Sequence, residues 1–139
     1  DCINRVNKNI DVAVFSAAVA DFKINKVSSA KLKKNNFRTL KLKKNIDILQ
    51  TISNQKINRP KYIVGFSAET NKQNYAIKKL KDKNCQMIIY NQITKENKIF
   101  FLNYNKISII TKDKIKNYAK TSKVKCAKYI IDSIYDEIK

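Results

Sequence analysis

The chain has 139 residues, of which 43% are hydrophobic and 29% charged, so it can form one globular domain with a buried core, which we place at residues 1–139. It has no histidine and three widely spaced cysteines without a C-x-x-C pattern. This argues against a zinc site and a disulfide framework, and it predicts a reducing, cytoplasmic location. No apolar run approaches the roughly 18 residues that span a bilayer, so we expect no membrane partner.

The formal net charge of +19 raises nucleic acid as a partner, because lysine and arginine neutralise phosphates. Only three of the 30 basic residues are arginine, however, and the lysines are spread along the whole chain. The chain is also rich in isoleucine and asparagine, which like lysine have A/T-rich codons. We therefore expect no nucleic-acid partner, although a basic nucleic-acid-binding domain stays open as an alternative.

The first predicted element is a strand at residues 11–17, a short β-branched and apolar run typical of a strand buried on both faces of a parallel sheet. A polar, lysine-rich stretch follows at 21–44. It has little periodicity, apart from an alternation over Thr39–Lys43 that indicates an edge strand. Such a stretch in a compact domain is more often functional than filler, so we predict a flexible flap at about 21–44.

Alternating helices and strands are predicted next. Asp47 stands where it can cap a helix that runs from Ile48 to about Asn54. Tyr62–Phe66 is a second apolar strand, a helix is predicted at about 71–83, and Met87–Tyr90 is a third strand. The order strand, helix, strand, helix, strand predicts right-handed crossovers and a parallel sheet.

The pattern changes in the last third of the chain. Ile99–Leu102 and Ile107–Ile110 flank a four-residue polar connection, which predicts an antiparallel β-hairpin. Ser122 can cap a final helix. The apolar stripe of that helix comprises Val124, Ala127, Ile130, Ile131, Ile134 and Ile138. The predicted fold class is α/β, a Rossmann-like three-layer parallel sheet with an added antiparallel β-hairpin.

Ligands of open α/β sheets bind at the carboxyl ends of the strands, where we place the loops 16–34, 66–71 and 91–92. These loops hold Asp21, Glu69, Asn91 and many lysines, which suits a phosphate-rich ligand with a hard cation. The alternative interpretation is a set of solvated loops. The lack of histidine excludes His-based nucleophilic and proton-transfer mechanisms within the chain. A single glycine excludes both a Walker A loop and a G-x-G-x-x-G fingerprint.

Six short motifs occur in order over nearly all of the chain. They are Ala17–Phe22 (AAVADF), Lys31–Lys34 (KLKK), Lys44–Leu49 (KNIDIL), Val64–Thr70 (VGFSAET), Lys83–Asn84 and Asn91. In this order and spacing they resemble the signature of phosphopantothenate-cysteine ligase. The resemblance implies a homodimeric enzyme of coenzyme A biosynthesis that uses CTP and Mg²⁺ to join 4′-phosphopantothenate and L-cysteine through an acyl-cytidylate.

The resemblance also implies the roles of individual residues. The nucleotide lies along Ser16, Ala17 and Asp21, and Asp21 is the metal partner. Lys31, on the flap, is the catalytic residue, which stabilises charge that develops on the reacting acyl phosphate. The remaining nucleotide-binding residues are a turn that reads the base largely through its backbone, a nearby aromatic and two lysines near the triphosphate: Ile46, Asp47, Ile48, Leu49, Phe66, Lys79 and Lys83.

Two departures from the family pattern bear on this site. Ile46 replaces the usual proline, which predicts a less rigid turn, and Gln92 replaces the acidic residue often found after Asn91. Reading of a base through the backbone leaves both CTP and ATP open as the nucleotide.

The resemblance further implies that an N-terminal strand–helix portion of the ligase domain is missing here. FMN is expected only where a fused decarboxylase domain is present. The predicted hairpin at Ile99–Ile110 is the expected dimer interface. A non-catalytic structural fragment stays open as a third interpretation.

Overall fold

The computed structural model describes residues 9–31, 39–70, 73–94 and 102–139. Its centre is a five-stranded sheet with the strand order β1-β4-β5-β7-β8. The strands are β1 (Val12–Phe15), β4 (Tyr62–Glu69), β5 (Met87–Gln92), β7 (Ile107–Thr111) and β8 (Ile115–Asn117). β1, β4 and β5 are parallel, whereas β7 and β8 each run antiparallel to the strand before them in the sheet. The predicted α/β class with a mainly parallel sheet is confirmed.

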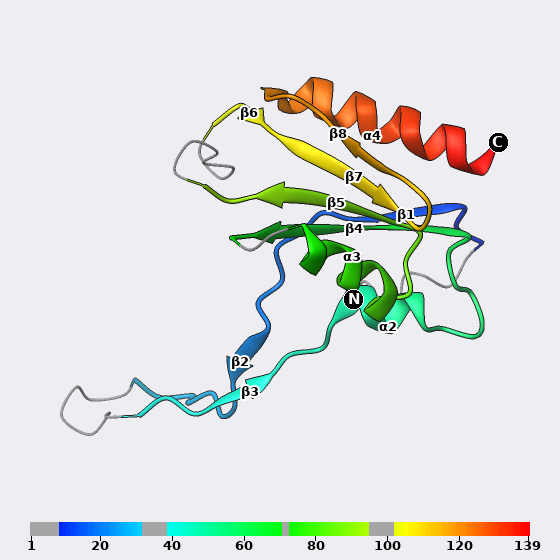
Figure 1. Ribbon diagram of the computed structural model, residues 1–139. Coiled ribbons are helices and arrows are strands. Elements are labelled where there is room, and N and C mark those ends of the chain that lie inside the picture. The colour runs from blue at the N-terminus through cyan, green and yellow to red at the C-terminus, as the bar shows by residue number, and fades with distance from the viewer. Residues whose placement is uncertain (1–8, 32–38, 71–72, 95–101) are drawn as a thin grey trace.

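Helices cover both faces of this sheet (Figure 1). The short helix α2 (Ile48–Ser53) and the helix α3 (Asn74–Asp82) lie on one face, and α4 (Lys123–Ile138) lies on the other. Successive residues of a strand point to opposite faces. Ile88 and Tyr90 therefore pack with α3, while Met87 and Ile89 pack with α4. Two apolar clusters result, one on each side of β4 and β5.

The described residues 22–31 and 39–44 of the polar stretch form an arm that projects from the body of the molecule (Figure 1). β2 (Phe22–Ile24) and β3 (Leu42–Lys44) pair antiparallel within it, and all six residues are exposed. The edge strand expected at Thr39–Lys43 is thus observed slightly later, and it pairs with β2 rather than with the main sheet. Residues 32–38, between the two strands, lie outside the described residues.

The predicted hairpin at Ile99–Ile110 is wrong in its partners. Its second strand forms β7, but β7 pairs with β5 and with β8. The expected connection instead contains β6 (Tyr104–Asn105), which pairs with β9 (Thr121–Ser122). The antiparallel hairpin of this fold is β7–β8, closed by a bond from Thr111 N to Lys114 O of 2.9 Å. The buried isoleucines of β7 place that strand inside the sheet beside β5, and residues 99–101 lie outside the described part.

The last helix begins where the sequence predicts, because the Ser122 side chain accepts a hydrogen bond from Lys125 N at 3.2 Å. Its buried face differs from the predicted stripe. The buried residues are Cys126, Ile130, Ser133 and Ile134, whereas Val124 is 82% and Ile131 60% exposed. The six apolar positions span a wider face of the helix than the sheet can cover. Only the part of that face around Ile130 is buried.

The strand ends differ from the expected loops. β4 continues to Glu69 and β5 to Gln92, because neighbouring parallel strands satisfy their backbone groups up to those residues. The following helix begins at Asn74, later than expected, and residues 71–72 lie outside the described part. Among the described residues, no helix is long and apolar enough to cross a membrane.

Candidate functional site at the carboxyl edge of the sheet

The carboxyl ends of β1, β4 and β5 meet at one edge of the sheet. Ser16 and Ala17 follow β1 directly and are exposed, and Phe15 lies beside Gly65 of β4 on the face that carries α2 and α3. The turn before α2 lies beside the loop that follows β1, because Asn45 donates hydrogen bonds to Ala20 O and Asp21 O. The first predicted loop and the predicted base-reading turn are therefore neighbours.

Hydrogen bonds join the turn to the base of the arm. Asn45 N donates to Asp21 O at 2.7 Å, and Asn45 Nδ2 donates to Ala20 O at 3.1 Å. Ile46 N donates to Asn45 Oδ1 at 3.0 Å, a bond that a proline could not make because it has no N–H. The replacement of proline by Ile46 is thus accompanied by a hydrogen bond that holds the turn locally.

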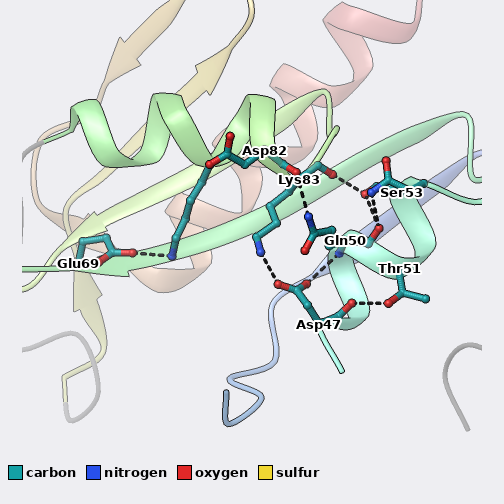
Figure 2. A network of polar contacts seen from close by, with 9 residues as sticks. Asp47, Gln50, Thr51, Ser53, Glu69, Asp82 and Lys83 are labelled. Carbon is teal, nitrogen blue, oxygen red and sulfur yellow. Dashed lines mark hydrogen bonds and ion pairs between the residues drawn. The ribbon is translucent and has the colours of Figure 1, made fainter. Parts of the chain in front are cut away.

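Asp47 serves two elements at once (Figure 2). Its Oδ1 accepts a hydrogen bond from Gln50 N at 2.8 Å and so caps α2, as predicted. Its Oδ2 accepts a hydrogen bond from the Lys83 ammonium group at the end of α3. Burial opposes ionisation of this carboxyl group, but the Lys83 and Gln50 hydrogen bonds outweigh it, so the pKa of Asp47 lies below its usual range.

A second ion pair lies nearer the end of β4. Lys79 Nζ of α3 lies 2.5 Å from Glu69 Oε1, and Ser67 Oγ donates to the same oxygen at 3.1 Å. The Glu69 side chain is only 19% exposed, so the sheet fixes the carboxylate while the lysine reaches it from the helix. Burial, and after it the Glu69 carboxylate, raises the pKa of Tyr90 on the neighbouring strand.

A network at the far ends of α2 and α3 holds the two helices together. Arg59 Nε donates to Ser53 O at 2.7 Å, and Arg59 Nη2 donates to Asn84 O at 2.9 Å. The buried Ser53 hydroxyl donates to Lys83 O, and Asn84 Nδ2 donates to Ser53 O at 3.1 Å. Asn84 has a φ of 48°, which asparagine tolerates better than most residues. Sequence reasoning did not find Arg59, since a lone arginine gives no pattern.

Of the predicted site residues, Asp47 and Lys83 contact each other directly, and Asp21 is bonded to the same turn through its backbone. Lys79 instead pairs with Glu69, which was predicted only as part of the loop after the strand. Phe66 points to the opposite face, where it packs against the α4 cluster. β1 pairs with β4 only as far as Gly65. A ligand that contacts both Phe66 and the turn must therefore cross β4 beyond the end of β1. Asn91 is buried at the end of β5 and accepts a hydrogen bond from Asn105 Nδ2 at 2.8 Å.

Lys31 and the carboxylate of Asp21 are not joined to these pairs. Both residues are exposed; Asp21 directly precedes β2, and Lys31 follows β2 in the same polar stretch. Within the described ranges, no three acidic or cysteine side chains gather as a metal cage. A lone exposed carboxylate does fit Mg²⁺, which proteins commonly hold through one or two carboxylates together with substrate phosphates.

Comparison with protein families gives one matching model. Residues 1–138 match the model described as "DNA/pantothenate metabolism flavoprotein C-terminal domain". Among curated proteins, the coenzyme A biosynthesis bifunctional protein CoaBC of Borreliella burgdorferi is 36% identical over 135 residues, which is 94% of this chain and 33% of the relative. The CoaBC protein of Haemophilus influenzae is 35% identical over 122 residues, which is 86% of this chain and 30% of the relative.

Solved structures give the same picture for the fold. The crystal structure of the C-terminal domain of a CoaBC protein superposes with a TM-score of 0.74 at 27% identity, covering 99% of this chain and 59% of that one. A Streptococcus pneumoniae structure titled "DNA/Pantothenate Metabolism Flavoprotein" superposes with a TM-score of 0.71 at 16% identity, which bears on the fold alone. The chain thus spans about one third of the length of these curated relatives.

Proposed function

Since the chain belongs to the family of the DNA/pantothenate metabolism flavoprotein C-terminal domain, we propose that it carries the nucleotide-binding half of a phosphopantothenate-cysteine ligase. The relatives named for coenzyme A biosynthesis support the pathway. The observation that carries the proposal is that two lysines of α3 reach the loops implied to bind the nucleotide: the Lys83 ammonium group pairs with Asp47 in the turn before α2, and Lys79 pairs with Glu69 at the carboxyl end of β4.

The proposed reaction has two steps. The carboxylate of 4′-phosphopantothenate attacks the α-phosphorus of CTP, an oxygen–phosphorus bond forms and pyrophosphate leaves. The amino group of L-cysteine then attacks the acyl carbon of this acyl-cytidylate. A carbon–nitrogen bond forms, the carbon–oxygen bond to the phosphate breaks, CMP leaves with the electron pair of that bond, and the nitrogen releases one proton to solvent. Both steps develop negative charge on phosphate oxygens, which explains a need for lysines rather than for a histidine base.

Each part of the edge has a proposed role in nucleotide binding. The backbone of the Ile46–Leu49 turn hydrogen-bonds the base, while Ser16 and Ala17 lie along the nucleotide. Lys79 and Lys83 exchange their carboxylate partners for phosphate oxygens when the triphosphate enters, because an ammonium group pairs with either anion. A bound Mg²⁺ would neutralise phosphate charge, held by Asp21 together with the phosphates.

Lys31 is the proposed catalytic residue. Its position on the exposed arm means that the arm and the edge must come together when substrates bind, as flaps do in many enzymes. The arm also exposes Phe22, Ile24 and Leu42, and apolar side chains that gather in this way support the further proposal of a homodimer. Sedimentation of the protein at micromolar concentration tests the dimer, and a single monomeric species contradicts it.

The first experiment is the melting temperature of the protein with millimolar Mg²⁺ and CTP, ATP, UTP or no nucleotide. A ligand that binds only the native state adds about 2.7 kcal/mol of stability at a concentration of 100 times Kd. We expect CTP to raise the melting temperature by several degrees. Lys83→Ala and Lys79→Ala should reduce this shift, whereas Lys56→Ala, an exposed lysine before the amino end of β4, should leave it unchanged.

Two results would count against the proposal. Equal stabilisation by every nucleotide and by duplex DNA, falling steeply with salt, would indicate a general polyanion site. No shift with any nucleotide would support a structural fragment.

A further inference from the structure

Gly65 is the single glycine of the chain, and it lies in the middle of β4. Among the described residues no glycine has a positive φ, so a special backbone conformation does not explain its presence. Space explains it. A Cβ atom at this position would lie 2.7 Å from Leu49 Cδ2 and 2.9 Å from Ile88 Cδ1, closer than carbon atoms approach in proteins. Because Gly65 has no side chain, the surface of β4 has a notch at this position, and the Leu49 side chain occupies it.

Leu49 lies in the first turn of α2 and is the last residue of the Ile46–Leu49 turn proposed to read the base. Its side chain packs against the apolar cluster that α3 and the sheet form together. The two other attachments of this turn are polar. They are the Asn45 bonds to the loop after β1 and the Asp47 pair with Lys83. The contact between Leu49 and Gly65 is thus the apolar contact that holds this turn against the sheet.

We propose that Gly65 is a positioning residue for base recognition: its notch sets how deeply Leu49 sinks into the sheet and therefore where the backbone groups of residues 46–49 stand. This inference rests on the proposed nucleotide site and assigns the base end of that site. Backbone hydrogen bonds to a base weaken steeply with small displacements. The lysines near the phosphates have flexible stems that tolerate such displacements.

The notch can be filled without destroying the fold. The atoms nearest the added methyl group are the ends of two side chains, so Gly65→Ala is accommodated if Leu49 moves outward. That movement carries the turn with it. The effect of the substitution should therefore fall on the base end of the ligand, and relief at Leu49 should reverse it.

The test is equilibrium binding of CTP and of ribose 5′-triphosphate, which lacks the base, to the wild type and to Gly65→Ala, each with Mg²⁺. We expect the Kd for CTP to rise at least tenfold in Gly65→Ala and the Kd for the abasic triphosphate to change less than twofold. In the background of Leu49→Ala, where the methyl group has room, Gly65→Ala should change the Kd for CTP less than twofold.

Ile88→Val is the matched control, because it removes the other nearby atom without touching the turn, and it should not rescue CTP binding. Rescue by Ile88→Val equal to that by Leu49→Ala would overturn the inference, as would an unchanged Kd for CTP in Gly65→Ala. An equal loss for both ligands would also overturn it. If Gly65→Ala alone does not fold, the double variant Gly65→Ala/Leu49→Ala should fold and bind CTP within twofold of Leu49→Ala, and failure of either would overturn the inference. A wild type that binds no CTP contradicts the proposed function itself, whereas normal CTP binding by Gly65→Ala contradicts only the role of the notch.

Discussion

The Lys83 ammonium group at the end of α3 donates a hydrogen bond to the Asp47 carboxylate that caps α2 (Figure 2). One carboxylate thereby fixes the beginning of one helix to the end of another. Because Lys83 is also proposed to contact the triphosphate, the Asp47 carboxylate and a phosphate would compete for the same ammonium group. Nucleotide binding should thus be coupled to the position of the turn before α2.

The two functions of Asp47 can be separated by substitution. Asp47→Ala removes both the cap and the ion pair, and we expect it to lower the free energy of unfolding by about 1–2 kcal/mol. Asp47→Asn retains a side-chain oxygen that can cap α2 and loses only the charge, so its loss should be smaller. Urea denaturation measures both values. Equal losses for the two variants would mean that the charge, and not the cap, is what Asp47 contributes.

The lowered pKa of Asp47 predicts a dependence on pH. The carboxyl group is more acidic in the folded protein than its ordinary value of 3.8, so its contribution to stability is present above about pH 4 and is lost as the pH falls through the folded pKa. The difference in stability between the wild type and Asp47→Asn should therefore shrink below about pH 4. A difference that stays constant from pH 6 to pH 3 would contradict this origin.

Arg59 is predicted to depend on the shape of its side chain rather than on its charge. Its guanidinium group bonds the backbone oxygens of Ser53, Pro60 and Asn84 at 2.7–3.2 Å. A lysine keeps the charge but has one nitrogen, which cannot reach three carbonyl groups in different directions. We expect Arg59→Lys to lower the free energy of unfolding by about 1–3 kcal/mol in urea denaturation. A loss no larger than that of Lys56→Ala, an exposed lysine in the same loop, would contradict the prediction.

Sequence periodicity predicted the parallel strands and the two capped helices because each depends on local information. Apolar runs of four to six residues mark β1, β4 and β5, and Asp47 and Ser122 stand next to the apolar residues of their helices. The partners of β7 depend on tertiary contacts. The sequence predicted that Ile107–Ile110 pairs with Ile99–Leu102, but the strand pairs with β5 and β8, where its isoleucines are buried.

For the candidate site, the sequence predicted several of the residues but not their contacts. The resemblance indicated Asp47, Lys79 and Lys83, but not that both lysines pair with carboxylates of the chain itself. Those pairings depend on the relative position of α3, the end of β4 and the turn before α2. Gly65 could be noticed in the sequence as the single glycine, yet only the position of Leu49 shows what it makes room for.

The buried face of α4 gives a prediction that separates the structure from the sequence pattern. Both Ile131 and Ile134 belong to the apolar stripe that periodicity indicates, but Ile134 is 5% exposed and Ile131 is 60% exposed. Ile134→Ala should lower the free energy of unfolding by about 2–5 kcal/mol, because it leaves a cavity between the helix and the sheet. Ile131→Ala should change it by less than about 0.5 kcal/mol, as exposed substitutions commonly do. Comparable losses would contradict the orientation of α4 and would show that a partner or another segment covers Ile131.

Tyr62, at the amino end of β4, should make the protein sensitive to alkaline pH. Its hydroxyl oxygen is buried and has no hydrogen-bond partner among the described residues. Burial, followed by the Glu137 carboxylate, raises its pKa to about 12. Between about pH 10 and pH 12 the unfolded chain releases this proton before the folded protein does, so the stability of the wild type should fall as the pH rises through that window.

Tyr62→Phe lacks the hydroxyl group and should lose less stability over the same range. At pH 7 it should be as stable as the wild type or slightly more stable, because a buried hydroxyl group without a partner is costly. Urea denaturation at pH 7, 10 and 11.5 measures both effects, and parallel pH profiles for the two proteins would show that the hydroxyl group is solvated in the native state.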